Sequence, residues 1–158
     1  MLCITQSDIN SRKIDKGTDK YGHWSYIKFA AHNSTVFTVI TAYKPCVVTK
    51  ITDITTYHQQ LALHQSETTT TINPHKAFTC DLLKWMLLGH RKGEKIILGG
   101  GFNESLTSTS DIIKFCSHDD LKLIDIFVEL TQESFSTTKT GKQRIDYMLI
   151  SPELKQSV

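Results

Sequence analysis

The chain has 158 residues, and its 18 Lys and Arg against 16 Asp and Glu give a formal net charge of +2. This length predicts one domain or part of one. A near-neutral charge gives no evidence for bulk electrostatic attraction to nucleic acid or anionic lipid. Hydrophobic residues make up 39% of the chain, which argues against a disordered protein. The sequence also contains no apolar run long enough to span a membrane.

The four cysteines are too far apart in the sequence to form a C-x-x-C pair; they are Cys3, Cys46, Cys80 and Cys116. We interpret them as buried, reduced thiols, with Cys80 and Cys116 on the apolar faces of predicted helices. The apolar stretch at the N-terminus is too short for a secretory signal, and the residues that follow it are too polar. An intracellular protein is the expectation.

The N-terminal part predicts mainly strands. The expected elements are a short strand over Leu2–Thr5, a loop or hairpin connection over Ser11–Gly22, and strands over Trp24–Ala30 and Val36–Tyr43. The last two strands are separated by a tight polar link and therefore predict an antiparallel hairpin. Pro45 ends the second of them.

Two helices are expected next. The first covers Asp53–Ser66, where apolar residues recur at helical spacing. The second begins at Asn73-Pro74, an N-cap followed by proline at the first helical position. Phe78, Leu82 and Met86 repeat every four residues on it and predict a buried stripe; Gly89 or Gly93 ends this helix.

The C-terminal part alternates between strand and helix patterns. It predicts a strand over Lys95–Leu98 that runs into Gly99–Gly101, a helix over Ser108–Cys116, and strands over Leu121–Phe127 and Arg144–Ile150. This order indicates an α/β layered fold. Residues two apart on a strand share a face, so Arg144 and Asp146 are expected to project together, away from Ile145 and Tyr147.

Three short stretches carry the chemical signal: Tyr43-Lys44-Pro45 after a buried strand, Gly100-Gly101-Phe102-Asn103 after an apolar strand, and Arg144-Ile145-Asp146-Tyr147 on the last strand. Each alone has an ordinary structural explanation, such as a tight turn or a surface ion pair. The glycines do not continue into the G-x-G-x-x-G pattern of a dinucleotide site.

Together, in this order, the stretches resemble the endonuclease/exonuclease/phosphatase superfamily, which includes abasic-site endonucleases and type I deoxyribonuclease. The chain is most similar to the domains carried by non-LTR retroelement polyproteins, next to their reverse transcriptases. Gly22 to Ile27 and the helix from Asn73 also resemble such sequences. The resemblance implies a four-layer α/β sandwich, here partial, with two mixed or antiparallel sheets and flanking helices.

The resemblance further implies hydrolysis of phosphodiesters with Mg²⁺ as cofactor and DNA as partner. It implies an intracellular setting, with the nucleus as one candidate location. By position, Tyr43 would be the active-site tyrosine beside the phosphate. Asn103 would hold the scissile phosphate or the attacking water. Asp146 would orient a catalytic histidine, and Arg144 would be a neighbouring cationic or structural residue, assigned to substrate binding.

Three family features have no counterpart here. Gly101 stands where the family places the Asp that positions the attacking water, and loss of a general base typically costs about 10²–10⁴-fold in rate. Leu2 to Gly22 resembles family sequence that follows the metal-binding Glu, so the chain lacks that ligand. The Ser-Asp-His motif would come after Val158. Ser117-His118-Asp119 has a scrambled order and precedes Arg144, so we do not expect it to replace that motif. Residues 1–158 are therefore expected to be a single incomplete, catalytically degenerate domain.

Two alternatives remain open at this point. One is a still-active nuclease or phosphatase. The other is a non-catalytic nucleic-acid-binding remnant that uses basic residues: Lys92, Lys95, Lys139, Lys142 and Arg144. The other histidines have no metal-site spacing and are expected at surface or cap positions. Unpaired strand edges and exposed apolar faces predict marginal stability for the isolated chain.

Overall fold

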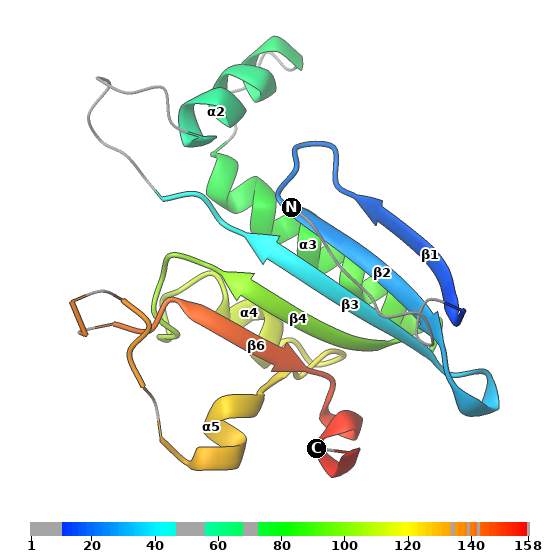
Figure 1. The fold of residues 1–158 in the computed structure, drawn as a ribbon. Helices are drawn as coiled ribbons and strands as arrows, with labels where there is room; N and C mark the ends of the chain where they lie inside the picture. The colour runs from blue at the N-terminus through cyan, green and yellow to red at the C-terminus, as the bar shows by residue number, and fades with distance from the viewer. Residues whose placement is uncertain are drawn as a thin grey trace.

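The computed structural model describes residues 11–46, 56–67, 73–133, 135–138, 140–141 and 143–157. These residues form a six-stranded mixed sheet with helices against it, which confirms the α/β class (Figure 1). The order of the strands across the sheet is β1-β2-β3-β4-β6-β5. The elements along the chain are β1 (Lys13–Thr18), β2 (Trp24–Ala30), η1 (His32–Ser34), β3 (Val36–Tyr43), α2 (Thr56–Glu67), α3 (Pro74–Arg91), β4 (Lys95–Gly101), α4 (Ile113–Ser117), β5 (Ile124–Asp125), α5 (Ile126–Thr131), β6 (Asp146–Ile150) and η2 (Pro152–Ser157).

The strand pairing brings the last residues of β3 and β4 beside the first residue of β6. β2 and β3 form the antiparallel hairpin that the sequence predicts, with the short helix η1 as its link. The chain then passes through α3 and returns as β4, parallel to β3. β6 pairs antiparallel with β4, so β6 begins beside the residues at which β3 and β4 end.

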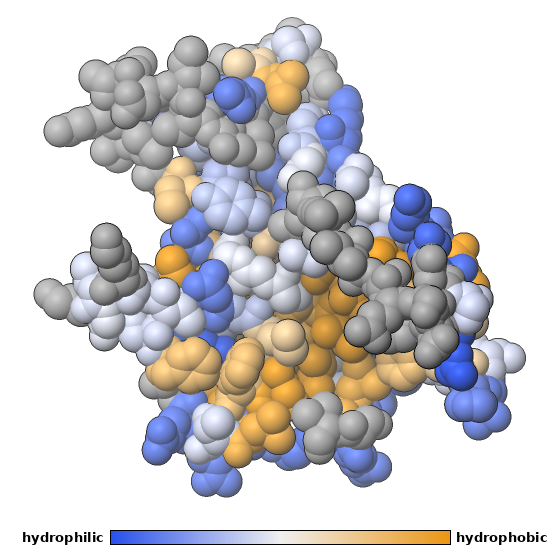
Figure 2. Space-filling view, in the orientation of Figure 1, coloured by the Kyte–Doolittle hydropathy of each residue, from blue (hydrophilic) through white to orange (hydrophobic). Residues whose placement is uncertain are grey.

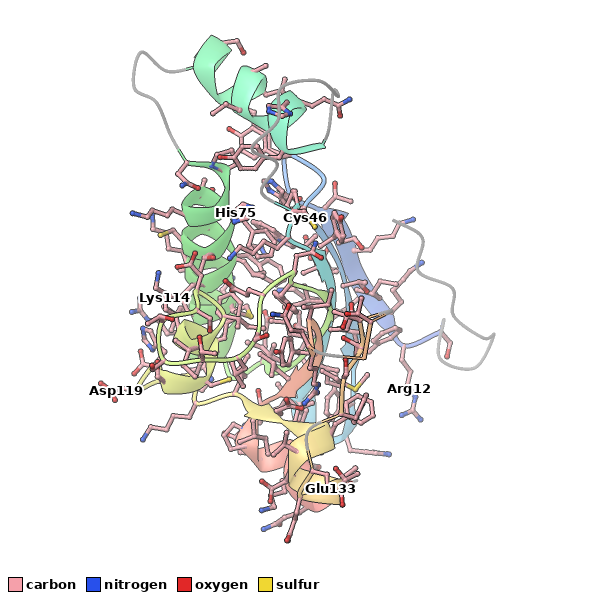
Figure 3. The ribbon with its side chains drawn as sticks, turned by 90° about the vertical axis from the view of Figure 1, so that its left-hand side faces the viewer. Arg12, Cys46, His75, Lys114, Asp119 and Glu133 are labelled. Atoms are coloured by element: carbon pink, nitrogen blue, oxygen red, sulfur yellow. The ribbon has the colours of Figure 1, made fainter. Side chains whose placement is uncertain are left out.

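The helix α3 covers one face of the sheet. The Asn73 side chain accepts hydrogen bonds from the backbone N–H groups of His75 and Lys76, as an N-cap residue does. The predicted stripe, Phe78, Leu82 and Met86, is at most 1% exposed. It packs against inward-facing residues of β3, β4 and β6 in the main hydrophobic core. In Figure 3, α3 lies along one side of the strands, and α4, which carries the labelled Lys114, lies on the same side.

We call the opposite face of the sheet the outer face; the described residues cover it over only part of its length. Ile97 and Ile150 on that face join a second, smaller cluster with Ile126 of α5 and Leu154 of η2. Figure 2 shows hydrophobic side chains gathered on this face beside the covered part. The outer-face positions at the last residues of β3 and β4 and the first residue of β6 therefore lie at the surface rather than in a core.

The structure differs from the sequence expectations in two elements. Ser11–Gly22 contains the strand β1, which pairs with β2 although its residues are mostly exposed and polar. Strand pairing here overrides weak local propensity, and the charged side chains suit an edge strand. Leu121–Phe127 is not one strand: only Ile124–Asp125 is extended, because the Asp125 carboxylate accepts a hydrogen bond from the N–H of Phe127 and caps α5.

Other boundaries shift, and some expectations fall outside the described residues. The helix expected over Ser108–Cys116 is shortened to α4, and the last strand begins at Asp146 rather than Arg144. The expected strand over residues 2–5 and the first three residues of the helix expected from residue 53 lie outside the described residues. The described residues hold one sheet of the two that the resemblance implies, and they contain no helix long and apolar enough to cross a membrane.

The cysteine prediction is wrong in part. Cys80 is exposed on α3 and Cys46 is exposed just after β3, although both are free thiols as expected. Cys116 is half-buried, and burial raises the pKa of its thiol to about 11. At neutral pH this thiol stays protonated and is a poor nucleophile. Cys3 lies outside the described residues.

Candidate active site

Three of the predicted site positions form a row across neighbouring strands. Tyr43 is the last residue of β3 and pairs with Gly101, the last residue of β4. Gly101 pairs in turn with Asp146, the first residue of β6. Paired residues on adjacent strands point to the same face of a sheet. We call these three residues the strand-end row; it lies on the outer face, where Tyr43 is 45% exposed.

Gly101 is the central position of the strand-end row. A Cβ atom placed on it would lie 3.1 Å from Oδ1 of Asp146 and 3.6 Å from Cδ2 of Tyr43. A side chain at this position would therefore stand between the tyrosine ring and the carboxylate. With glycine there, the middle of the row has no functional group.

Asn103 follows the row by two residues and is held by β3. Its φ is 53°, a left-handed backbone conformation that asparagine tolerates better than most residues. Its Nδ2 donates a hydrogen bond of 2.6 Å to the carbonyl of Lys44. The adjacent Phe102 is 1% exposed and anchors the turn in the core. The amide is thus fixed next to the residue that follows Tyr43.

The carboxylate of Asp146 is exposed and available for a ligand. Its backbone N–H donates to the hydroxyl of Thr137, which also accepts from the N–H of Ile145. Within the described ranges, no group donates a hydrogen bond to the carboxylate itself. The backbone of Asp146 is fixed while its acidic oxygens face solvent.

Arg144 does not project with Asp146, contrary to the expectation from strand alternation. It precedes β6, is 6% exposed, and forms a two-pronged ion pair with Asp125 through NH1 at 2.7 Å and NH2 at 2.8 Å. Its Nε donates to the backbone carbonyl of Asp146. The guanidinium also lies 4.7 Å from the ring centre of Tyr147. These contacts make Arg144 part of the framework behind the strand-end row.

Sequence reasoning missed an ion cluster beneath the row, in which a buried lysine meets two partly exposed carboxylates. Lys44 is 2% exposed, and its ammonium lies 2.9 Å from Glu104 and 3.4 Å from Asp111. Glu104 also accepts hydrogen bonds from the N–H groups of Asp111 and Ile112. The cluster therefore fixes the loop that carries Asn103. A lysine next to a site tyrosine gives no sequence signal of burial, so this role could not be found from the pattern.

The histidines are expected at surface or cap positions, but His23 lies at neither. It is 2% exposed, and its Nδ1 lies 3.0 Å from Oδ2 of Asp19. His75 follows the expectation more closely, at the start of α3 (Figure 3). Burial, and then the charge of Lys44, lower its pKa. His118 only accepts a local hydrogen bond from the N–H of Asp120, so it does not join the row.

The described residues do not fit the Mg²⁺ site that the resemblance implies. Among them no group of three or more His, Cys, Asp or Glu side chains is placed to hold a metal ion. Asp146 supplies the only carboxylate of the strand-end row, and Gly101 supplies no ligand atom. Mg²⁺ sites rely on carboxylate oxygens in near-octahedral geometry. No catalytic step through a metal follows from these residues.

Of the basic residues considered for nucleic-acid binding, the structure describes three, and Arg144 lies apart from Lys92 and Lys95. Lys95 begins β4, at the end opposite to Gly101, and pairs with Glu153 at 3.0 Å. Lys92 caps the end of α3, and Arg144 is buried against Asp125. Lys139 and Lys142 lie outside the described residues. In the part of the chain that the structure describes, these residues form no shared basic patch.

Comparisons with known proteins give only partial likenesses. No family model and no curated protein matches the sequence. The human Nocturnin catalytic domain with bound sulfate is similar at a TM-score of 0.48 and 16% identity, over 82% of this chain and 41% of that chain. A beta toxin from Staphylococcus aureus is similar at a TM-score of 0.37 and 14% identity, over 84% of this chain and 44% of that chain. The chain spans less than half the length of either structure, and these values assign it no family and no activity.

Proposed function

We propose that this chain is part of a single phosphodiesterase domain of the endonuclease/exonuclease/phosphatase type, of retroelement origin, and that its own active site binds DNA phosphate without cleaving it. The observation that carries the proposal is the strand-end row. Three residues from separate parts of the sequence are paired side by side, and Asn103 is fixed beside them. These are the positions to which the family resemblance assigns catalytic groups.

The groups present suit binding of a phosphodiester better than its hydrolysis. The Tyr43 hydroxyl and the Asn103 amide are hydrogen-bond donors, and a phosphate oxygen accepts from such groups. Hydrolysis also needs a base that positions water, and Gly101 offers none. Without such a base, we expect a rate lower by about 10²–10⁴-fold. The absence of a fitting metal site among the described residues points the same way.

A plasmid assay tests the loss of catalysis. We expect the purified chain, incubated with supercoiled plasmid and Mg²⁺, to produce no nicked circle above the buffer control. Metal-dependent nicking that disappears in Asn103→Ala would show instead an active nuclease.

An oligonucleotide titration tests the binding half of the proposal. We expect a fluorescein-labelled DNA duplex to bind weakly, with an affinity that falls as salt rises. Tyr43→Phe removes one hydroxyl and should weaken binding by about 10- to 100-fold, the value of one lost hydrogen bond to a charged group. Tyr26→Phe is the matched control, because that hydroxyl contacts Asp15 in the edge strand. Equal affinity for both variants would contradict a phosphate site at the strand-end row.

A further inference from the structure

The three consecutive glycines of β4 do not share one explanation. Gly100 has a φ of +152°, and a Cβ atom on it would lie 1.8 Å from the carbonyl oxygen of Ala42. The backbone therefore requires glycine at position 100. At Gly99 the added Cβ would meet only the Tyr147 carbonyl oxygen, at 4.0 Å, and at Gly101 it would meet side-chain atoms at 3.1 Å or more. Backbone geometry does not require glycine at either of these positions.

Gly99 and Gly101 form the floor of a pocket, and their lack of side chains leaves its space open. Both lie on the outer face, because they alternate with the inward-facing Leu98 of the core. A pocket of about 390 Å³ opens above them. This volume lies in the range of about 300–1,000 Å³ that is usual for ligand sites. A side chain at Gly99 would project into this space, so the missing side chains create the pocket.

The walls of this glycine-floored pocket are aromatic and apolar. Phe127 and Phe135 line it, with ring centres 5.4 Å apart and planes at 90°, and Met148 lines it as well. The Arg144 guanidinium supports both rings, at 5.2 Å from Phe135 and 5.7 Å from Phe127. Because Arg144 is itself locked to Asp125, the aromatic wall has a rigid support.

Among the described residues that line the pocket, Asp146 alone carries a charged group. Neither lysine nor arginine is among the described residues that line it. A flat glycine surface opposite aromatic rings favours a planar ring, which gains stacking contacts with both. A carboxylate at the side accepts hydrogen bonds, which favours a ring that carries N–H donors.

We propose that the glycine-floored pocket binds a nucleobase of the same nucleic acid whose phosphate lies at the strand-end row; the inference rests on the proposed function. Gly101 and Asp146 belong both to the row and to the pocket, so phosphate and base would be bound side by side. Adenine, cytosine and guanine each present an exocyclic amino group to Asp146. Thymine lacks one, so the pocket should prefer the amino-bearing bases.

The test uses the full chain and two small probes, adenosine and ribose 5-phosphate, titrated separately by NMR. Adenosine carries the base without phosphate, and ribose 5-phosphate carries phosphate without the base. We expect adenosine to shift the amide signals of residues 99–101 and the ring signals of Phe135. Gly99→Leu should fill the pocket and weaken adenosine binding at least tenfold. Ser25→Leu is the matched control, since Ser25 pairs with Thr41, which pairs with Gly99, and the added leucine lies two strands away.

The outcomes separate the two proposals. The proposal of nucleobase binding in the pocket is overturned if adenosine does not bind, or if it binds the natural protein and Gly99→Leu equally. Ribose 5-phosphate that binds while adenosine does not overturns the pocket and leaves the proposed function standing. Adenosine that binds while ribose 5-phosphate does not overturns the phosphate site and leaves the pocket. If Gly99→Leu does not fold, Phe135→Ala replaces it, because Phe135 is 44% exposed and contributes little to the core.

Discussion

Gly101 and Asp146 are paired neighbours on β4 and β6, and a Cβ atom on Gly101 would lie 3.1 Å from Oδ1 of Asp146. The family that the sequence resembles has an aspartate at the position of Gly101. With that residue restored, two carboxylates would face each other across one strand pair. Close carboxylates repel, so the pKa of one of them rises unless a cation lies between them.

Gly101→Asp is therefore expected to create a divalent-cation site. Two adjacent carboxylates supply the hard oxygen ligands that Mg²⁺ and Mn²⁺ prefer. We expect Mn²⁺ to bind this variant at least tenfold more tightly than the natural chain, measured from the paramagnetic broadening of NMR signals near residue 146. Gly99→Asp is the control, because it adds the same charge to the same face two residues away. Equal Mn²⁺ affinity in the two variants would contradict the geometry of the strand-end row.

Gly100→Ala is expected to destabilise the fold strongly. The added Cβ would overlap the Ala42 carbonyl oxygen, and the φ of +152° is strained for alanine. Backbone strain and overpacking together cost roughly 3 kcal/mol or more of the free energy of unfolding. Urea denaturation followed by circular dichroism measures this loss. Gly99→Ala is the control and should change the unfolding free energy by about 1 kcal/mol or less.

Elements with strong periodic patterns could be predicted from the sequence. The β2–β3 hairpin and the start of α3 follow from β-branched runs and from Asn73-Pro74, and the structure confirms them. β1 could not be predicted, because its polar residues become a strand only by pairing with β2. Local propensity carries no information about such a partner.

The site was predictable in its positions but not in its contacts. The sequence patterns predict Tyr43 at the end of one strand, Gly101 just after another, and Asp146 within a strand that begins at Arg144. The structure begins that strand at Asp146, and the register pairs the three residues. Arg144 was assigned a place beside Asp146, yet its partner Asp125 lies 19 residues away in the sequence. The burial of Lys44 likewise depends on Glu104 and Asp111, which only the folded chain brings near.

Arg144→Lys is expected to cost far more stability than a surface substitution. Arg144 and Asp125 have side chains only 5% and 7% exposed, and a lysine cannot reproduce the two-pronged contact. Removing one partner of a buried pair typically costs about 3–5 kcal/mol, and Arg144→Lys, which keeps the charge but loses the two-pronged contact, should cost a substantial part of that. Lys155→Ala, which removes an exposed ion pair with Glu129, is the control and should cost about 1 kcal/mol or less. Similar urea midpoints for the two variants would show that the Arg144 pair contributes little.

Glu94 makes stability depend on pH on the acid side. Burial raises the pKa of its carboxyl group, but hydrogen bonds from Lys28 and Thr38, both 2.6 Å long, outweigh burial, so the pKa lies below its usual value of 4.5. A carboxyl group whose pKa is lowered by folding stabilises the folded state above the unfolded pKa. That contribution is lost as the pH falls through the folded pKa.

The free energy of unfolding is therefore expected to fall as the pH drops below about 4.5. Glu94→Gln removes the titrating group, so this variant should be less stable near neutral pH and should lose less stability on acidification than the natural chain. Urea denaturation near pH 7 and near pH 3 measures both effects. Glu153→Gln is the control, because the Glu153 side chain is 52% exposed in its pair with Lys95 and should contribute less. An equal acid-side loss in natural chain and Glu94→Gln would assign that loss to other carboxyl groups, such as Asp19, whose pKa is also lowered.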